Sequence, residues 1–400
     1  MFSKSNHTLK FLLFISVLIY ACSDYNKFEN TIKPQNSDAK KKKVWEGSPY
    51  VEWESSTFLN PLKPYLGTDE GILTWEGSLS DTGFQIEKAV LLNFKNGQTL
   101  WRHAYKPITK TVLENPLVIK SKFSRIPVLA SWVDGDLFRI QNLKTGEDIL
   151  NKPNCKYISN FKNLLFGYCM GRITVINLEN NKKLLTVTSP IKPIYVKSIS
   201  NYKVLLSDVK HNIYLFDLTT KKLNLLQQNK PIIYLRTDKK TIYEVYTSND
   251  GVIFEVNILK NDELKTKWSV ALSGDITNFW FHKTDKFIIY PTGMECISAV
   301  NSKNGSEEWT SCGVYEKTPP AWDNDGIYIL SSRVINNLRP LIFIDNGNGM
   351  QTPLFQSLQG ENSINPILAY MLTPGKAYHG MIYAVKNKSK IMAIRIAAPE

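Results

Sequence analysis

Five cysteines are the residues of this sequence whose spacing says most about chemistry: Cys22, Cys155, Cys169, Cys296 and Cys312. The last four form two close pairs, Cys155 with Cys169 and Cys296 with Cys312. The interval within each pair suits two neighbouring antiparallel strands joined by a hairpin. In an oxidising compartment such pairs form local disulfides, and buried free thiols are the alternative.

The sequence signals for metal-binding and catalytic sites are weaker than those for disulfides. The sequence has no Cys-x-x-Cys, and the five histidines are scattered without the spacing of metal ligands. The segment Asp345–Gly349 is similar to a calcium loop, but it lacks the downstream glutamate, which favours a glycine-rich hairpin turn. No nucleophile elbow, phosphate loop or His-Glu-x-x-His occurs. We therefore expect no enzyme activity, no cofactor and no metal.

Cys22 differs from the other cysteines because a secretion signal precedes it. Residues 1–10 are polar and carry Lys4 and Lys10, and residues 11–21 are apolar, which is typical of a signal peptide over residues 1–21. The apolar run is shorter than the roughly 20 residues that span a bilayer. Ile19-Tyr20-Ala21-Cys22 resembles the bacterial lipobox, whose cysteine becomes the acylated N-terminus. An ordinary secretory signal with an incidental cysteine is the alternative.

Residues 22–43 are expected to form a lipidated, flexible tether, because they are rich in Asn, Lys, Ser and Asp and lack apolar periodicity. Ser23 follows Cys22, and by resemblance to the enteric sorting rule this sends the lipoprotein to the outer membrane. We expect anchoring at the periplasmic face, where the cysteine pairs would be oxidised.

The net charge of +13 invites a nucleic-acid function. Part of this charge belongs to the first 43 residues, which include the run Lys40-Lys41-Lys42-Lys43. The remainder is spread along the chain without an arginine-rich stretch or a nucleic-acid motif. We therefore expect no nucleic-acid partner.

The elements that must position these residues are repeated. From Val44 onward, a unit of short β-rich runs with a polar turn recurs about every forty residues. The turns lie near eight positions: Gly97, Gly146, Asn181, Thr220, Asp262, Gly305, Gly349 and Lys388. This pattern predicts an all-β fold, a single β-propeller over residues 44–400 with eight four-stranded blades. Seven blades are the alternative, because the first and last units must share a closing blade.

Two further expectations concern how blades join. Trp101, Trp268 and Trp309 each follow a turn and are bulky enough to fill the wedge between adjacent blades. The copies at 173–185 and 213–223 lack both the turn glycine and the tryptophan. The ring is expected to close between the run around Gly71–Trp75 and the final strand Lys390–Arg395, whose apolar residues alternate.

The copies, of which Cys296–Trp309 is the most complete, resemble the pyrroloquinoline-quinone-type propeller repeat. Together with the lipobox and the length of 400 residues, they resemble the B-subunit lipoproteins of the outer-membrane β-barrel assembly machinery. This resemblance implies a non-enzymatic scaffold whose partners are the barrel-assembly core protein and unfolded outer-membrane proteins. A carbohydrate- or polyanion-binding propeller lipoprotein and a degenerate quinoprotein are the alternatives. The quinoprotein is disfavoured because no two cysteines adjoin.

Overall fold

The computed structural model describes residues 49–55, 66–68, 70–80, 83–104, 117–119, 128–133, 137–153, 155–180, 182–249, 251–273, 276, 279–357, 364–369, 371–372, 375–377, 379–386 and 390–396. Regular secondary structure in these ranges is entirely β-strand. They contain no helix long and apolar enough to cross a membrane. Gly47–Glu400 form one compact unit. The predicted signal peptide, Cys22 and the predicted tether lie outside the described residues.

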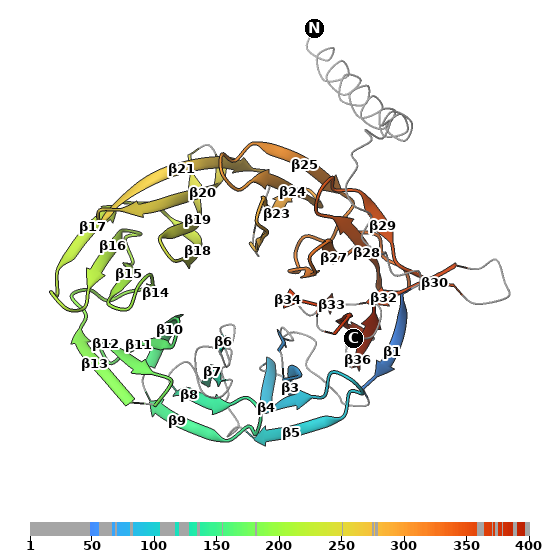
Figure 1. Ribbon diagram of the computed structural model, residues 1–400, viewed down its shortest axis with the longest axis horizontal. Coiled ribbons are helices and arrows are strands. Elements are labelled where there is room, and N and C mark those ends of the chain that lie inside the picture. The colour runs from blue at the N-terminus through green and yellow to red at the C-terminus, as the bar shows by residue number, and fades with distance from the viewer. Residues whose placement is uncertain are drawn as a thin grey trace, which may run out of the picture. The chain divides into compact units, whose positions relative to one another are not determined.

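Eight sheets of at least four strands occur in the described part of that unit, and we number them as blades 1–8 (Figure 1). Each blade runs from an inner strand to an outer one. Blade 1 contains β2 (Leu66–Gly67), β3 (Ile72–Ser80), β4 (Gly83–Leu92) and β5 (Thr99–Ala104). Blade 2 contains β6 (Leu117–Ile119), β7 (Val128–Val133), β8 (Leu137–Asn142) and β9 (Asp148–Pro153). Blade 3 contains β10 (Cys155–Phe161), β11 (Leu164–Cys169), β12 (Arg172–Asn177) and β13 (Lys182–Thr188).

Blades 4 to 6 repeat the same antiparallel order. Blade 4 contains β14 (Tyr195–Ser198), β15 (Lys203–Ser207), β16 (Ile213–Asp217) and β17 (Leu223–Gln227). Blade 5 contains β18 (Ile232–Asp238), β19 (Thr241–Ser248), β20 (Gly251–Lys260) and β21 (Glu263–Leu272). Blade 6 contains β22 (His282–Lys283), β23 (Phe287–Gly293), β24 (Cys296–Asn301) and β25 (Glu307–Cys312).

The last two blades depart from that order. Blade 7 contains β26 (Ala321–Trp322), β27 (Gly326–Leu330), β28 (Arg339–Asp345) and β29 (Gln351–Pro353), to which β32 (Leu368–Ala369) and β34 (Gly375–Lys376) add. A separate hairpin pairs β30 (Phe355–Ser357) with β31 (Ile364–Pro366). Blade 8 combines β33 (Met371–Leu372), β35 (Met381–Lys386) and β36 (Lys390–Arg395) with β1 (Tyr50–Glu54) from the other end of the chain.

The core lies between blades, and this explains why the middle strands are almost uniformly apolar. A strand covered on both faces buries every side chain, so its sequence loses the alternation of a half-exposed strand. Phe166 of blade 3 packs in one buried cluster with Val204 of blade 4. Leu215 of blade 4 shares another with Ile242 of blade 5. Each blade is therefore stabilised by its neighbours.

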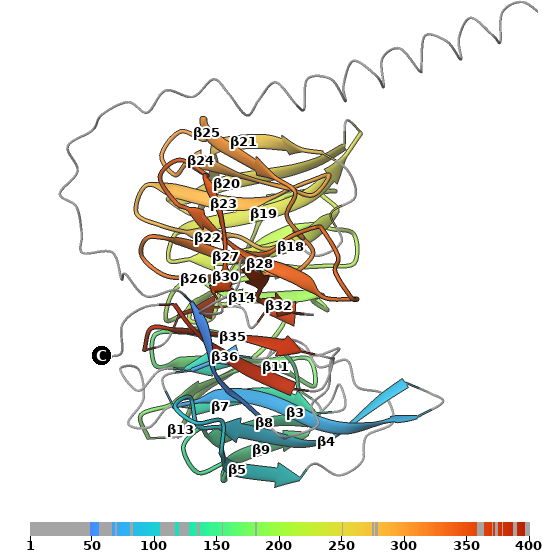
Figure 2. The same cartoon turned by 90° about the vertical axis from the view of Figure 1, so that its right-hand side faces the viewer.

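Ring closure differs from the sequence expectation. The final strand β36 does not pair with Gly71–Trp75; it pairs with β1, with Val51 opposite Ile394 and Glu54 opposite Met392. Figure 2 shows the blue β1 beside the red β35 and β36. Ile72 belongs to blade 1 and lies in the same buried cluster as Ile391 of blade 8. The repeat pattern concealed this, because β1 lies before the first complete copy.

Four tryptophans of outer strands fill the wedges between blades. Each indole packs on the turn glycine of the following blade, in the pairs Trp53–Gly97, Trp101–Gly146, Trp268–Gly305 and Trp309–Gly349. These glycines have φ between +69° and +75°, and a Cβ there would lie within 2.9 Å of the ring. Each indole also donates a hydrogen bond to a backbone carbonyl of that blade. The predicted role of Trp101, Trp268 and Trp309 is confirmed, and Trp53 is a fourth case.

Candidate binding surface

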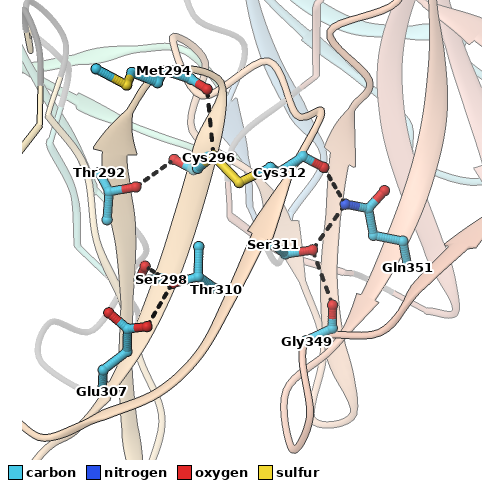
Figure 3. Close-up of a disulfide and its surroundings, with 10 residues drawn as sticks. All are labelled: Thr292, Met294, Cys296, Ser298, Glu307, Thr310, Ser311, Cys312, Gly349 and Gln351. Carbon is cyan, nitrogen blue, oxygen red and sulfur yellow. Dashed lines mark hydrogen bonds between the residues drawn. A yellow bond between two sulfur atoms is a disulfide. The ribbon is translucent and has the colours of Figure 1, made fainter. Parts of the chain in front are cut away.

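One of the predicted cysteine pairs forms a disulfide in blade 6 (Figure 3). The Sγ atoms of Cys296 and Cys312 are bonded, and the two residues lie directly opposite each other on β24 and β25. Beside the bond, the Ser311 hydroxyl donates to the Gly349 carbonyl at 3.0 Å, and the Gln351 amide donates to Ser311 at 2.9 Å. The disulfide therefore braces the outer part of blade 6 where it joins blade 7.

The other predicted pair lies in blade 3. Cys169 is disulfide-bonded. The backbone register places Cys155, at the start of β10, directly opposite Cys169, at the end of β11. This is the arrangement that the predicted Cys155–Cys169 pair requires.

Cys169 and Cys296 each lie next to a hairpin that joins the second and third strands of a blade. Because successive strands alternate in direction, every hairpin between a second and a third strand lies on one face of a propeller, which we call the bc face. Cys169 precedes the β11–β12 hairpin and Cys296 follows the β23–β24 hairpin. The tips of these hairpins are Met170 and Met294, with 74% and 78% of their surfaces exposed.

Two more hairpins of the bc face present apolar tips. Val209 is 69% exposed between β15 and β16, and Val334 is 51% exposed between β27 and β28. The Val209 turn is rigid, because the Asp208 carboxylate accepts hydrogen bonds from the backbone N–H groups of Lys210 and Asn212 at 2.9 Å. Rigid loops with exposed Met and Val side chains suit protein contacts.

A buried ionic cluster lies in blade 5. The Lys230 ammonium is 3.1 Å from Glu244 Oε2 and 2.6 Å from Glu255 Oε1, and Glu244 is fully buried. Tyr246 Oη donates to Glu255 Oε2 at 3.1 Å, and Asn257 Nδ2 donates to Glu255 Oε1 at 2.7 Å. Lys230 belongs to the connection between β17 and β18, so the cluster fixes that connection to the core of blade 5.

The two carboxyl groups of this cluster have opposite pKa shifts. Burial raises the pKa of Glu244 despite the neighbouring Lys230 charge. Burial would also raise the pKa of Glu255, but hydrogen bonds from Lys230 and Asn257 and the Lys230 charge outweigh it, so that pKa is lowered. Burial opposes the charge of Lys230, and the attraction of both carboxylates nevertheless raises its pKa.

Asp345 and His282, whose residue types often bind metals or act in catalysis, make local contacts within the sheets. Asp345–Gly349 is the hairpin turn between β28 and β29, in which Asp345 Oδ1 accepts the backbone N–H of Gly347 at 2.7 Å. His282 is buried against Trp322, and burial lowers its pKa to about 4, so it is neutral at pH 7. Within the described ranges, no group of three or more His, Cys, Asp or Glu side chains could hold a metal ion.

Sequence reasoning missed the blade 5 cluster, although a signal was present. Glu244 and Glu255 interrupt the apolar runs Ile242–Tyr246 and Phe254–Val256. A carboxylate inside a strand that is buried on both faces needs a compensating cation. The partner, Lys230, lies outside both strands, so the spacing along the chain did not reveal it.

Comparison with known proteins supports the architecture. The computationally designed protein Ika8 has a TM-score of 0.57 and 10% identity, and the match covers 88% of this chain and all of that one. BamB from Moraxella catarrhalis has a TM-score of 0.53 and 11% identity, over 87% of this chain and 98% of that one. The C-terminal WD40 domain of Sif2 has a TM-score of 0.51 and 10% identity, over 89% and 99%.

The chain is a β-propeller. At 10–11% identity these similarities concern the fold alone. No protein family and no curated protein matches the sequence. The predicted all-β propeller of four-stranded blades is confirmed: seven of the described sheets have four strands and the sheet of blade 7 has six.

Proposed function

We propose that this protein is a lipid-anchored, non-enzymatic scaffold on the periplasmic face of the outer membrane. There it assists the assembly and insertion of β-barrel proteins, by contacts with the barrel-assembly core protein and with unfolded outer-membrane proteins. The observation that carries this proposal is the similarity in shape to BamB, which extends over 87% of this chain and 98% of that chain. The repeat and the lipobox of this sequence resemble the B-subunit lipoproteins of the barrel-assembly machinery, and BamB is named as such a B subunit.

The geometry of the ring supports a scaffold. Blades that pack on both faces hold their hairpins in fixed positions, and the bc face presents the exposed side chains of Met170, Val209, Met294 and Val334. The disulfide between Cys296 and Cys312 joins the start of β24, directly after the Met294 hairpin, to the end of β25. A rigid surface with several separate apolar tips can bind a folded partner without a large conformational cost.

The proposed anchor is the acylated Cys22. Substituting Cys22→Ala is expected to release the mature protein from the membrane, because three acyl chains give firm anchoring whereas a protein surface alone binds a bilayer weakly and reversibly. The measurement is fractionation of cell envelopes after a high-salt wash, with Cys155→Ala as the control that removes a cysteine and keeps the anchor. A Cys22→Ala protein that stays in the washed membrane fraction would show that acylation is not what holds it.

A further inference from the structure

The outer strands of the ring are open edges, and most of them carry residues that prevent another strand from adding. Natural sheets protect an exposed edge with charged side chains or proline. Seven of the eight outer strands contain such a residue: Glu52 in β1, Arg102 in β5, Asp148 in β9, Lys183 in β13, Lys265 in β21, Glu308 in β25 and Pro353 in β29. The exception is β17, whose sequence is Leu-Asn-Leu-Leu-Gln.

The β17 strand is paired with a neighbouring strand on its inner side only. It pairs with β16 and with no other described strand. Leu223 packs against the core shared by blades 3 and 4, and Leu226 packs against the core shared by blades 4 and 5. Leu225 is 46% exposed. A strand added outside β17 would therefore find free backbone groups and an apolar neighbour.

Both ends of β17 are held in place. Before the strand, the Thr219 hydroxyl donates to Asp217 Oδ1 at 2.6 Å, and this hydrogen bond is the main reason why the pKa of Asp217 is lowered to about 2. After the strand, Lys230 is bound by Glu244 and Glu255 in the core of blade 5. The edge is thus preorganised, which lowers the entropic cost of binding an extended chain.

The charge around β17 selects the occupant. Four lysines lie exposed on the turn before it and on the outer strand of blade 3: Lys182, Lys183, Lys221 and Lys222. The acids in the same stretches are Glu179, which is exposed, and Asp217, which is partly buried. A segment flanked by Asp or Glu gains from this excess of positive charge, whereas a lysine-rich segment is repelled.

We propose that β17 is the docking edge for clients: an extended segment of an unfolded polypeptide, with alternating apolar residues and acidic flanks, adds to it as a fifth strand of blade 4. Main-chain hydrogen bonds supply most of the affinity, so many client sequences fit. The inference rests on the proposed function, since it assigns the client-binding part of that function to one strand.

Leu225→Lys tests the inference by giving β17 a charge within the strand, as six of the other outer strands have. The probe is a fluorescent peptide of alternating Val and Thr with two Asp at each end, and anisotropy is measured with the detergent-solubilised full chain. Leu225→Lys should weaken binding by about tenfold or more, because the apolar contact is lost and a charge within the strand opposes strand addition. Leu225→Lys and Leu184→Lys each add one positive charge, so a general attraction to the acidic ends of the peptide is common to both variants. Leu184→Lys is the matched control, because Leu184 is 50% exposed on β13, an edge that already carries two lysines. Its affinity should stay within about twofold of that of the unmodified protein.

Backbone methylation separates strand addition from a simple apolar contact. Two peptides are compared, one N-methylated at the odd-numbered residues and one at the even-numbered residues. Only alternate N–H groups of an added strand face β17, so one of these peptides should lose binding and the other should keep it. Equal binding of the two peptides, or equal effects of Leu225→Lys and Leu184→Lys, would overturn the inference. So would a β17-dependent dimer of the chain that Leu225→Lys dissociates. If the peptide fails to bind while crosslinking still recovers the barrel-assembly core protein, the docking edge is refuted and the proposed function stands.

Discussion

Deletion of residues 391–400 is expected to abolish cooperative folding. The deletion removes β36, which is hydrogen-bonded to β35 on one side and to β1 on the other. Ile391, Met392, Ala393 and Ile394 are at most 1% exposed. Losing one large core side chain costs about 2–5 kcal/mol, and the deletion removes three such side chains together with a strand. The total loss is therefore comparable to the roughly 5–15 kcal/mol that stabilises a domain.

The measurement is thermal unfolding followed by circular dichroism, together with the rate of cleavage by a protease. A chain that ends at Ile396 is the matched control and should melt like the full-length protein, because it keeps β36. A 391–400 deletion that retains the melting transition of the control would show that the ring does not depend on β36 for closure.

Lys230→Met is expected to lower the free energy of unfolding by about 3–5 kcal/mol at pH 7, because it leaves two buried carboxylates without their cation. Glu244 is fully buried and Glu255 is 8% exposed, so both carboxylates are poorly solvated once the ammonium group is lost. The substitution shortens the side chain by only the terminal ammonium group, and the loss therefore reports the charge more than a cavity.

The loss should depend on pH in a defined direction. In the unmodified protein the pKa of Glu255 is lowered, so its stabilising contribution is present at neutral pH and disappears as the pH falls through that lowered pKa. Glu244 has a raised pKa, so it favours the folded state most at low pH, and that contribution is lost as the pH rises through it. Without Lys230 both pKa values rise, and the variant should regain stability between pH 7 and pH 5 as the carboxyl groups are protonated.

Urea unfolding at pH 7 and pH 5 measures both the loss and its recovery. Lys203→Met is the control, since Lys203 forms a partly exposed ion pair with Asp262 at 2.7 Å. Such pairs contribute about 0–1 kcal/mol. If Lys230→Met and Lys203→Met have equal effects, or if the Lys230→Met loss grows on acidification, the ionic cluster does not stabilise blade 5 in the way described.

Much of the propeller could be predicted from the sequence, because its repeats are periodic. Turn glycines such as Gly97, Gly146 and Gly305 recur with tryptophans, and the structure shows the physical reason: the tryptophan of one blade packs on the glycine of the next. The same relation explains why some copies of the repeat lack both residues. Blades 3 and 4 lack the turn glycine, and the outer strands β9 and β13 that precede them lack tryptophan.

The closing strand and the binding features could not be predicted in the same way, because they join residues far apart in the chain. β1 is a short strand before the first complete copy, and only its pairing with β36 identifies it as part of blade 8. Lys230 meets Glu255 through the fold and not through a motif. The open edge of β17 becomes visible only when all outer strands are known and can be compared.

Crosslinking in intact cells tests whether the protein is a scaffold of the barrel-assembly machinery. A photoreactive amino acid is placed at Met170 or Met294 on the bc face, and the crosslinked products are purified from outer membranes and identified by mass spectrometry. We expect the barrel-assembly core protein to be recovered from these positions. Recovery of glycan or lipopolysaccharide alone, with no protein of the barrel-assembly machinery, would contradict the scaffold function and favour a carbohydrate- or polyanion-binding propeller.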